Sequence, residues 1–238
     1  MSNDGSEPRF SGGGRTRALS IRRMAQARRM RLSVDPRSGD VRLVLPKRAA
    51  LKHALAWVEG KRDWIEQALA ALPSTLPIAP GAEIPFEGAT LTIDWEADRS
   101  RTPRREGDRL MLGGPRELVG PRVLRWLRRQ AADALEAETR AFALRAGVTV
   151  ARVRIGDPRA RWGSCSASGD IRYSWRLILA PPAVREATVA HEVAHRLHMN
   201  PGPEFHAAVK ALLGRDPAAE RAWLRSHGSA LYWLGRES

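Results

Sequence analysis

The sequence predicts an α+β protein in which a small antiparallel sheet and its helices precede a helix-rich part. Apolar and polar side chains alternate in three short runs, residues 18–24, 30–35 and 41–45, as expected of half-buried strands. Residues 121–147 instead carry apolar side chains at helical spacing. The third observation is the segment His-Glu-Val-Ala-His at residues 191–195, which lies in an alanine-rich run.

Composition along the chain predicts three parts. Residues 1–15 are rich in Ser, Gly and charge, and we expect a disordered basic tail there because so few apolar side chains cannot form a core. Residues 16–113 are expected to form a β-rich N-terminal part with helices. Residues 114–238 are expected to form the metal-binding catalytic part.

The helices and strands of the N-terminal part follow from local patterns. Residues 47–72 carry an apolar face at helical spacing and are expected to form two helices if the chain breaks near Gly60. The prolines of residues 73–85 predict a linker or loop. Short strands are expected at 90–95 and 109–112, on either side of a charged loop.

The catalytic part is expected to begin with the amphipathic helix over 121–147, with Gly147 as its C-cap. Residues 161–166 and 171–179 predict a β-hairpin that leads directly into a helix over 182–199. The remaining elements are a strand at 152–155 and helical segments at 203–213, 217–227 and 229–234.

Overall composition narrows the function classes. The chain has 238 residues, a net charge of +14 from 40 basic and 26 acidic side chains, and one cysteine, Cys165. A single cysteine excludes an internal disulfide and is typical of a reducing compartment. With no apolar run long enough for a membrane span and no signal-peptide pattern, we expect a cytoplasmic protein without membrane contact. Because the arginines are scattered, the charge fits either solvated faces or a basic surface that binds nucleic acid.

The histidine segment carries the chemistry. Side chains four residues apart on a helix differ by about 40° of rotation and one turn of rise, so His191 and His195 can reach one ion. Zinc binds neutral imidazole, and an adjacent carboxylate such as Glu192 can take a proton from water at the metal. Val184 and Thr188 continue the histidine stripe, and we expect this face of the helix to look into a cleft.

Several motifs together resemble the YgjP-like metallopeptidases, which are similar to the SprT-type zincins. The resemblance rests on Arg161-Trp162-Gly163-Ser164-Cys165, Gly169, Trp175-Arg176-Leu177-Ile178, Pro181 and the 191–195 segment, with further similarity at Leu45-Pro46 and Asp63-Trp64-Ile65. It implies a zincin-like α+β fold, a zinc ion, a hydrolytic water, and a peptide or protein substrate.

The resemblance also implies roles for single residues. His191 and His195 match the metal ligands, and Glu192 matches the general base. The position of the family's third histidine is Pro201 here, and proline has no donor for a metal. Replacement ligands remain open: His198, Glu204, His206 or none.

Two arginines of the hairpin are candidate substrate-binding residues. Arg161 and Arg176 can orient a substrate carboxylate or phosphate, or can pair with Asp or Glu. The sequence therefore favours a zinc-dependent metallopeptidase. The alternatives are a catalytically impaired module that binds nucleic acid or protein, and a metal-dependent hydrolase of nucleotide phosphoanhydrides.

Overall fold

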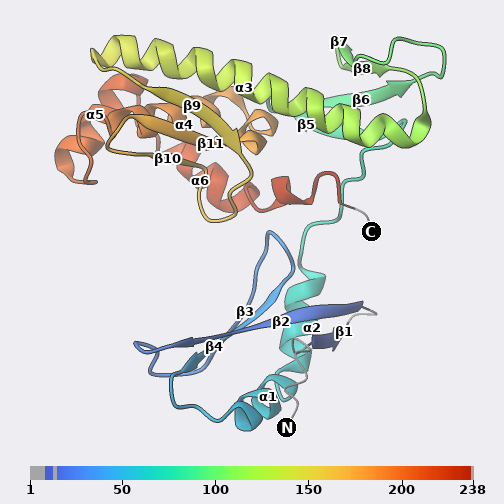
Figure 1. The fold of residues 1–238 in the computed structure, drawn as a ribbon, viewed down its shortest axis with the longest axis vertical. Coiled ribbons are helices and arrows are strands. Elements are labelled where there is room, and N and C mark those ends of the chain that lie inside the picture. The colour runs from blue at the N-terminus through green and yellow to red at the C-terminus, as the bar shows by residue number, and fades with distance from the viewer. Residues whose placement is uncertain (1–8, 13–14, 237–238) are drawn as a thin grey trace. The chain divides into compact units, whose positions relative to one another are not determined.

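The computed structural model describes residues 9–12 and 15–236, and the chain divides between Ser74 and Thr75 into two compact units (Figure 1). The expected division was at residue 113. It lies earlier because the apolar side chains of residues 84–112 share a core with the long helix that follows them. The predicted tail lies outside the described residues except at 9–12 and Arg15.

The N-terminal unit is a four-stranded sheet covered by two helices. The strands are β1 (Arg9–Gly12), β2 (Arg15–Met24), β3 (Arg31–Val34) and β4 (Val41–Pro46), in the order β1-β2-β4-β3. The expected antiparallel sheet is in fact mixed, because the β3–β4 hairpin places β3 at the edge and brings β4 alongside β2 in the same direction.

The predicted break near Gly60 is confirmed, and it separates α1 (Leu51–Glu59) from α2 (Arg62–Ala70). Apolar side chains from the sheet and from both helices form the core of this unit: Phe10, Leu19, Val41, Leu43, Leu45, Ala54, Val58 and Ile65.

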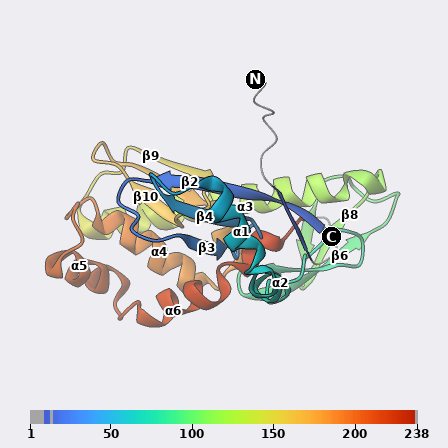
Figure 2. The same cartoon turned by 90° about the horizontal axis from the view of Figure 1, so that it is seen from below.

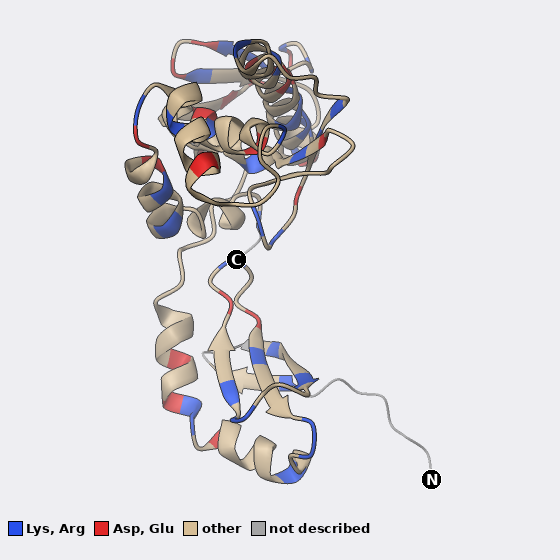
Figure 3. Cartoon of the chain, turned by 90° about the vertical axis from the view of Figure 1, so that its left-hand side faces the viewer, with Lys and Arg blue, Asp and Glu red and all other residues tan. Residues whose placement is uncertain are grey.

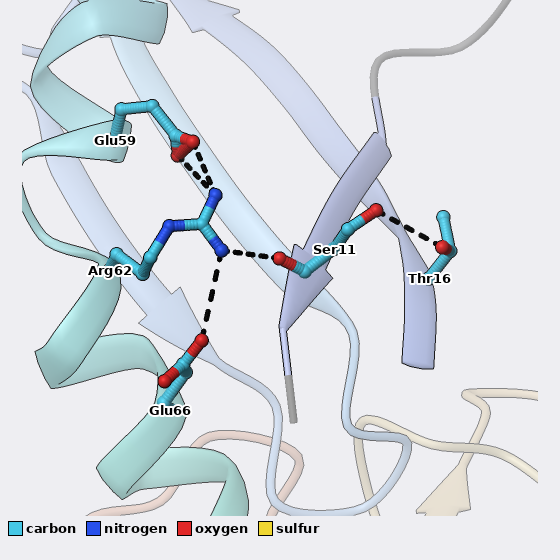
Figure 4. A network of polar contacts seen from close by, with 5 residues as sticks. All are labelled: Ser11, Thr16, Glu59, Arg62 and Glu66. Carbon is cyan, nitrogen blue, oxygen red and sulfur yellow. Dashed lines mark hydrogen bonds and ion pairs between the residues drawn. The ribbon is translucent and has the colours of Figure 1, made fainter. Parts of the chain in front are cut away.

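Strand β1 lies within the segment for which composition predicts disorder. Phe10 is only 3% exposed, and the backbone of residues 9–12 pairs with β2. Arg62 donates to the carbonyl oxygen of Ser11 and forms ion pairs with Glu59 and Glu66 (Figure 4). One buried ring and one arginine on a distant helix therefore order this strand.

The second unit begins with another mixed sheet. Its strands are β5 (Glu83–Phe86), β6 (Ala89–Trp95), β7 (Arg104–Glu106) and β8 (Arg109–Leu112), in the order β5-β6-β8-β7. Strand β5 falls in the proline-rich stretch that predicts a loop. It accommodates Pro85, which lacks a backbone N–H, because an edge strand has a neighbouring strand to hydrogen-bond with on one side only.

A 3₁₀ turn, η1 (Arg116–Leu118), leads into α3 (Val119–Ala146), which runs past both sheets of this unit (Figure 1). The helix ends as predicted at Gly147, whose φ of 65° is the left-handed conformation of a glycine C-cap.

The third sheet consists of β9 (Arg152–Gly156), β10 (Gly163–Cys165) and β11 (Asp170–Ser174), in the order β10-β11-β9. The predicted hairpin is confirmed, since β10 and β11 pair antiparallel. The expected strand over 171–179 instead stops at Ser174, and η2 (Trp175–Leu179) is a 3₁₀ helix. All five residues of η2 are buried, and such an unbroken run has no periodicity that separates strand from helix.

Helix α4 (Pro182–Ala194) lies between α3 and β10 on one side and α5 (Pro203–Leu213) and α6 (Ala218–His227) on the other (Figure 2). It ends five residues before the predicted position. The chain closes with η3 (Ala230–Trp233). Lys and Arg residues are spread over strands and helices of both units (Figure 3). Among the described residues, no helix is long and apolar enough to cross a bilayer.

Candidate active site

The two histidines of the 191–195 segment lie side by side at the end of α4. His191 is in the last turn, and His195 is the C-cap residue, with φ −62° and ψ −17°. Because His195 keeps helical dihedral angles, the one-turn spacing survives the early end of the helix. The ring centroids are 5.1 Å apart, with the ring planes nearly perpendicular.

Phe205 of α5 supports both imidazoles. Its ring is fully buried, and its centroid lies 4.9 Å from that of His191 and 4.5 Å from that of His195. His195 is also held by its Nδ1, which is 3.3 Å from the carbonyl oxygen of His198. A backbone partner at Nδ1 leaves Nε2 as the free nitrogen, which is the usual arrangement of a metal-binding histidine.

The protonation state of His191 suits a metal ligand. Burial lowers its pKa to about 4, and the nearby charges of His195, Arg221 and His206 act in the same direction. The imidazole is therefore neutral at neutral pH, as metal coordination requires.

Glu192 is 5% exposed and lies against the hairpin strand β10. A Cβ atom on Gly163 would be 2.4 Å from its Oε1, so only glycine leaves room for the carboxylate. Burial raises the pKa of Glu192 to about 7, which the charge of Arg161 opposes. No described residue donates a hydrogen bond to this carboxylate or forms an ion pair with it.

A cavity of about 270 Å³ opens beside these groups. Val184, Thr188 and His191 of the expected stripe line it, together with Ala187 and Glu192 of the same helix, whereas His195 does not. Residues of β10, α5 and α6 complete its wall, together with Arg161 and Trp162 just before β10 and Pro217 just before α6. A larger cavity, of about 640 Å³, lies beside residues 77–80 and α3, and neither the histidines nor Glu192 line it.

Comparison with known proteins supports the family that the motifs indicate. A family model described as the YgjP-like metallopeptidase domain matches residues 28–227. The chain belongs to the YgjP-like family. No curated protein and no solved structure matches the chain. The YgjP-like match contains His191, Glu192 and His195, and the family description implies a metal-dependent peptidase.

The YgjP-like chain has two candidate imidazole ligands for that metal, but its described residues do not provide a third ligand beside them. His191 and His195 are the candidate donors that lie together, with 5.1 Å between their ring centroids. His198 lies 3.6 Å, Nδ1 to Oε2, from Glu204, and His206 packs against Phe205 at 5.4 Å between ring centroids. Within residues 9–12 and 15–236, no three His, Cys, Asp or Glu side chains form a group that could hold a metal.

The two hairpin arginines have different surroundings. Arg161 is exposed and lines the cavity. Arg176 is buried and binds both carboxylate oxygens of Asp157, at 2.8 and 3.0 Å, as well as the carbonyl oxygen of Leu231 at 2.6 Å. Arg176 does not line this cavity. Of the two expected roles, its contacts with Asp157 match pairing with an acidic residue.

Sequence reasoning missed two residues beside the site. Arg221 of α6 lines the cavity, and Phe205 packs against both imidazoles. Both follow the histidines by many residues and belong to other helices. No local pattern marks them, because their position depends on how α5 and α6 pack on α4.

Proposed function

We propose that this YgjP-like chain is a zinc-dependent hydrolase of peptide bonds with a zincin-like fold. His191 and His195 would hold the metal, and Glu192 would act as general base. The observation that carries the proposal is that His191, whose ring lies against that of His195, lines one cavity together with the buried carboxylate of Glu192. A structural glutamate would instead have a partner.

Each chain residue then has a defined task. Zinc, when bound, supplies Lewis-acid chemistry that polarises the scissile carbonyl and lowers the pKa of water. Glu192 accepts the proton of the attacking water and delivers it to the leaving amine. Gly163 leaves space for that carboxylate, and Phe205 keeps both imidazoles in place.

Removing the metal tests the proposal. We expect purified protein loaded with zinc to hydrolyse peptides, dialysis against a chelator to abolish hydrolysis, and added zinc to restore it. Nucleoside triphosphates should not be hydrolysed in parallel assays. Peptide hydrolysis that survives complete metal removal would contradict the proposal, and exclusive hydrolysis of triphosphates would support the phosphoanhydride alternative.

A second prediction concerns Pro201, in the loop between α4 and α5. If Pro201 occupies the third ligand position, the substitution Pro201→His should raise zinc affinity at least about tenfold, because even partners outside the ligand shell change affinity 10- to 100-fold. Competition with a chromophoric chelator measures it. Met199→His is the matched control, since it adds a histidine to the same exposed segment. An unchanged affinity in Pro201→His would show that another residue already serves as ligand.

A further inference from the structure

We propose that the cavity beside Glu192 binds the C-terminal residue of a peptide, with an apolar side chain inside the cavity and the carboxylate on Arg161 and Arg221. This inference rests on the proposed peptidase function and names its substrate class: peptides that end in an apolar residue with a free carboxylate. The enzyme would then release that terminal residue.

The interior of the cavity suits one apolar side chain. Val184, Ala187 and Val209 are buried members of its wall, and Trp162 and Leu224 are half-buried members. The volume of about 270 Å³ lies below the 300–1,000 Å³ of pockets that enclose drug-sized ligands. There is therefore room for a side chain but not for a long segment of peptide.

The two cavity arginines are available for an anion. Arg161 makes no hydrogen bond or ion pair with any described residue, and Arg221 has only a 3.9 Å contact with Asp216. Both side chains are exposed, whereas the apolar members of the wall are buried or half-buried, so the guanidinium groups lie on the solvent side. Guanidinium groups bind carboxylates through paired, charge-assisted hydrogen bonds.

Both arginines are close enough to influence the reacting groups. Arg161 and Arg221 line the same cavity of about 270 Å³ as His191 and Glu192. A carboxylate held by this pair would therefore lie near the scissile bond. That arrangement is expected of an enzyme that removes one residue from a chain end.

Two acidic residues of the cavity wall affect which peptide side chains it can bind. Glu220 is 8% exposed, and its Oε1 accepts a hydrogen bond from Nε of Arg215 at 2.9 Å, so its charge is balanced outside the arginine pair. Its Oε2 is buried without a hydrogen-bond partner. Because Glu192 and Glu220 both line the cavity, it is unfavourable for an acidic side chain.

Calorimetric titration of the full chain with product-like acids tests the inference without hydrolysis. N-acetyl-leucine should bind at least about tenfold more tightly than its amide, because one hydrogen bond to a charged group is worth about that factor. It should also bind about tenfold more tightly than N-acetylglycine, which cannot fill the cavity. The same differences are expected with and without zinc, which excludes a carboxylate held by the metal alone.

Substitutions distinguish binding by Arg161 and Arg221 from a general effect of the protein's positive charge. Arg161→Gln and Arg221→Gln should each weaken binding of N-acetyl-leucine about tenfold, whereas Arg225→Gln, on α6 outside the cavity wall, should not. Equal binding of acid and amide, unaffected arginine variants, or no binding at all would overturn the inference. Cleavage of internal bonds with no need for a free C-terminus would overturn it while leaving the peptidase function intact. Selective binding without any hydrolysis would contradict the peptidase function alone.

Discussion

Glu192→Gln is expected to lower kcat for peptide hydrolysis by about 10²- to 10⁴-fold, the contribution of a positioned general base. Glutamine has nearly the same shape, so it fills the space beside Gly163 but cannot accept a proton. Since the carboxylate is buried without a hydrogen-bond donor among the described residues, its removal should not destabilise the fold. Steady-state kinetics and urea denaturation measure the two effects separately.

The matched control for this variant is Glu186→Gln on the same helix. Glu186 is only partly buried and lies 3.7 Å from Arg215, away from the wall that Glu192 shares with His191. We expect it to keep wild-type kcat and KM. Hydrolysis by Glu192→Gln at the rate of the wild type would remove the assigned base, and an equal loss in both variants would point to a general effect on α4.

Arg185→Met should give the largest loss of stability, about 3–5 kcal/mol, as expected when one partner of a buried ion pair is removed. Arg185 is 5% exposed and donates to Glu138 of α3 at 2.8 Å and to Glu87 at 3.0 Å. Burial raises the pKa of Glu138, and the hydrogen bond from Arg185 opposes this rise. Without the arginine, that carboxylate stays buried and loses its counter-charge.

Urea denaturation compares this variant with Arg129→Met, an arginine on the exposed face of α3. The Arg129 side chain is 80% exposed and lies 3.9 Å from Asp133, so its loss should change stability by no more than about 0.5 kcal/mol. A loss below about 1 kcal/mol for Arg185→Met would mean that the pair does not hold α4 against α3.

Much of the secondary structure follows from local sequence. Gly60 separates two helices and Gly147 ends a third, because glycine acts on its own backbone. The sequence overestimates the length of the strand that ends at Ser174. The residues of η2 that follow are all buried, so their hydrophobicity has no period that separates a strand from a helix. The expected antiparallel sheet was wrong for a different reason: the pairing of β4 with β2 depends on contacts between distant segments.

The sequence by itself determined the family, the mixture of helices and strands, and the closeness of His191 to His195, which one helical turn enforces. Only the tertiary structure decided that Phe205 supports both rings, that Gly163 faces Glu192, and that Arg161 rather than Arg176 lines the cavity. These contacts join β10, α4, α5 and α6. Periodicity reports which face of a single element is apolar, whereas a site built from four elements requires their packing.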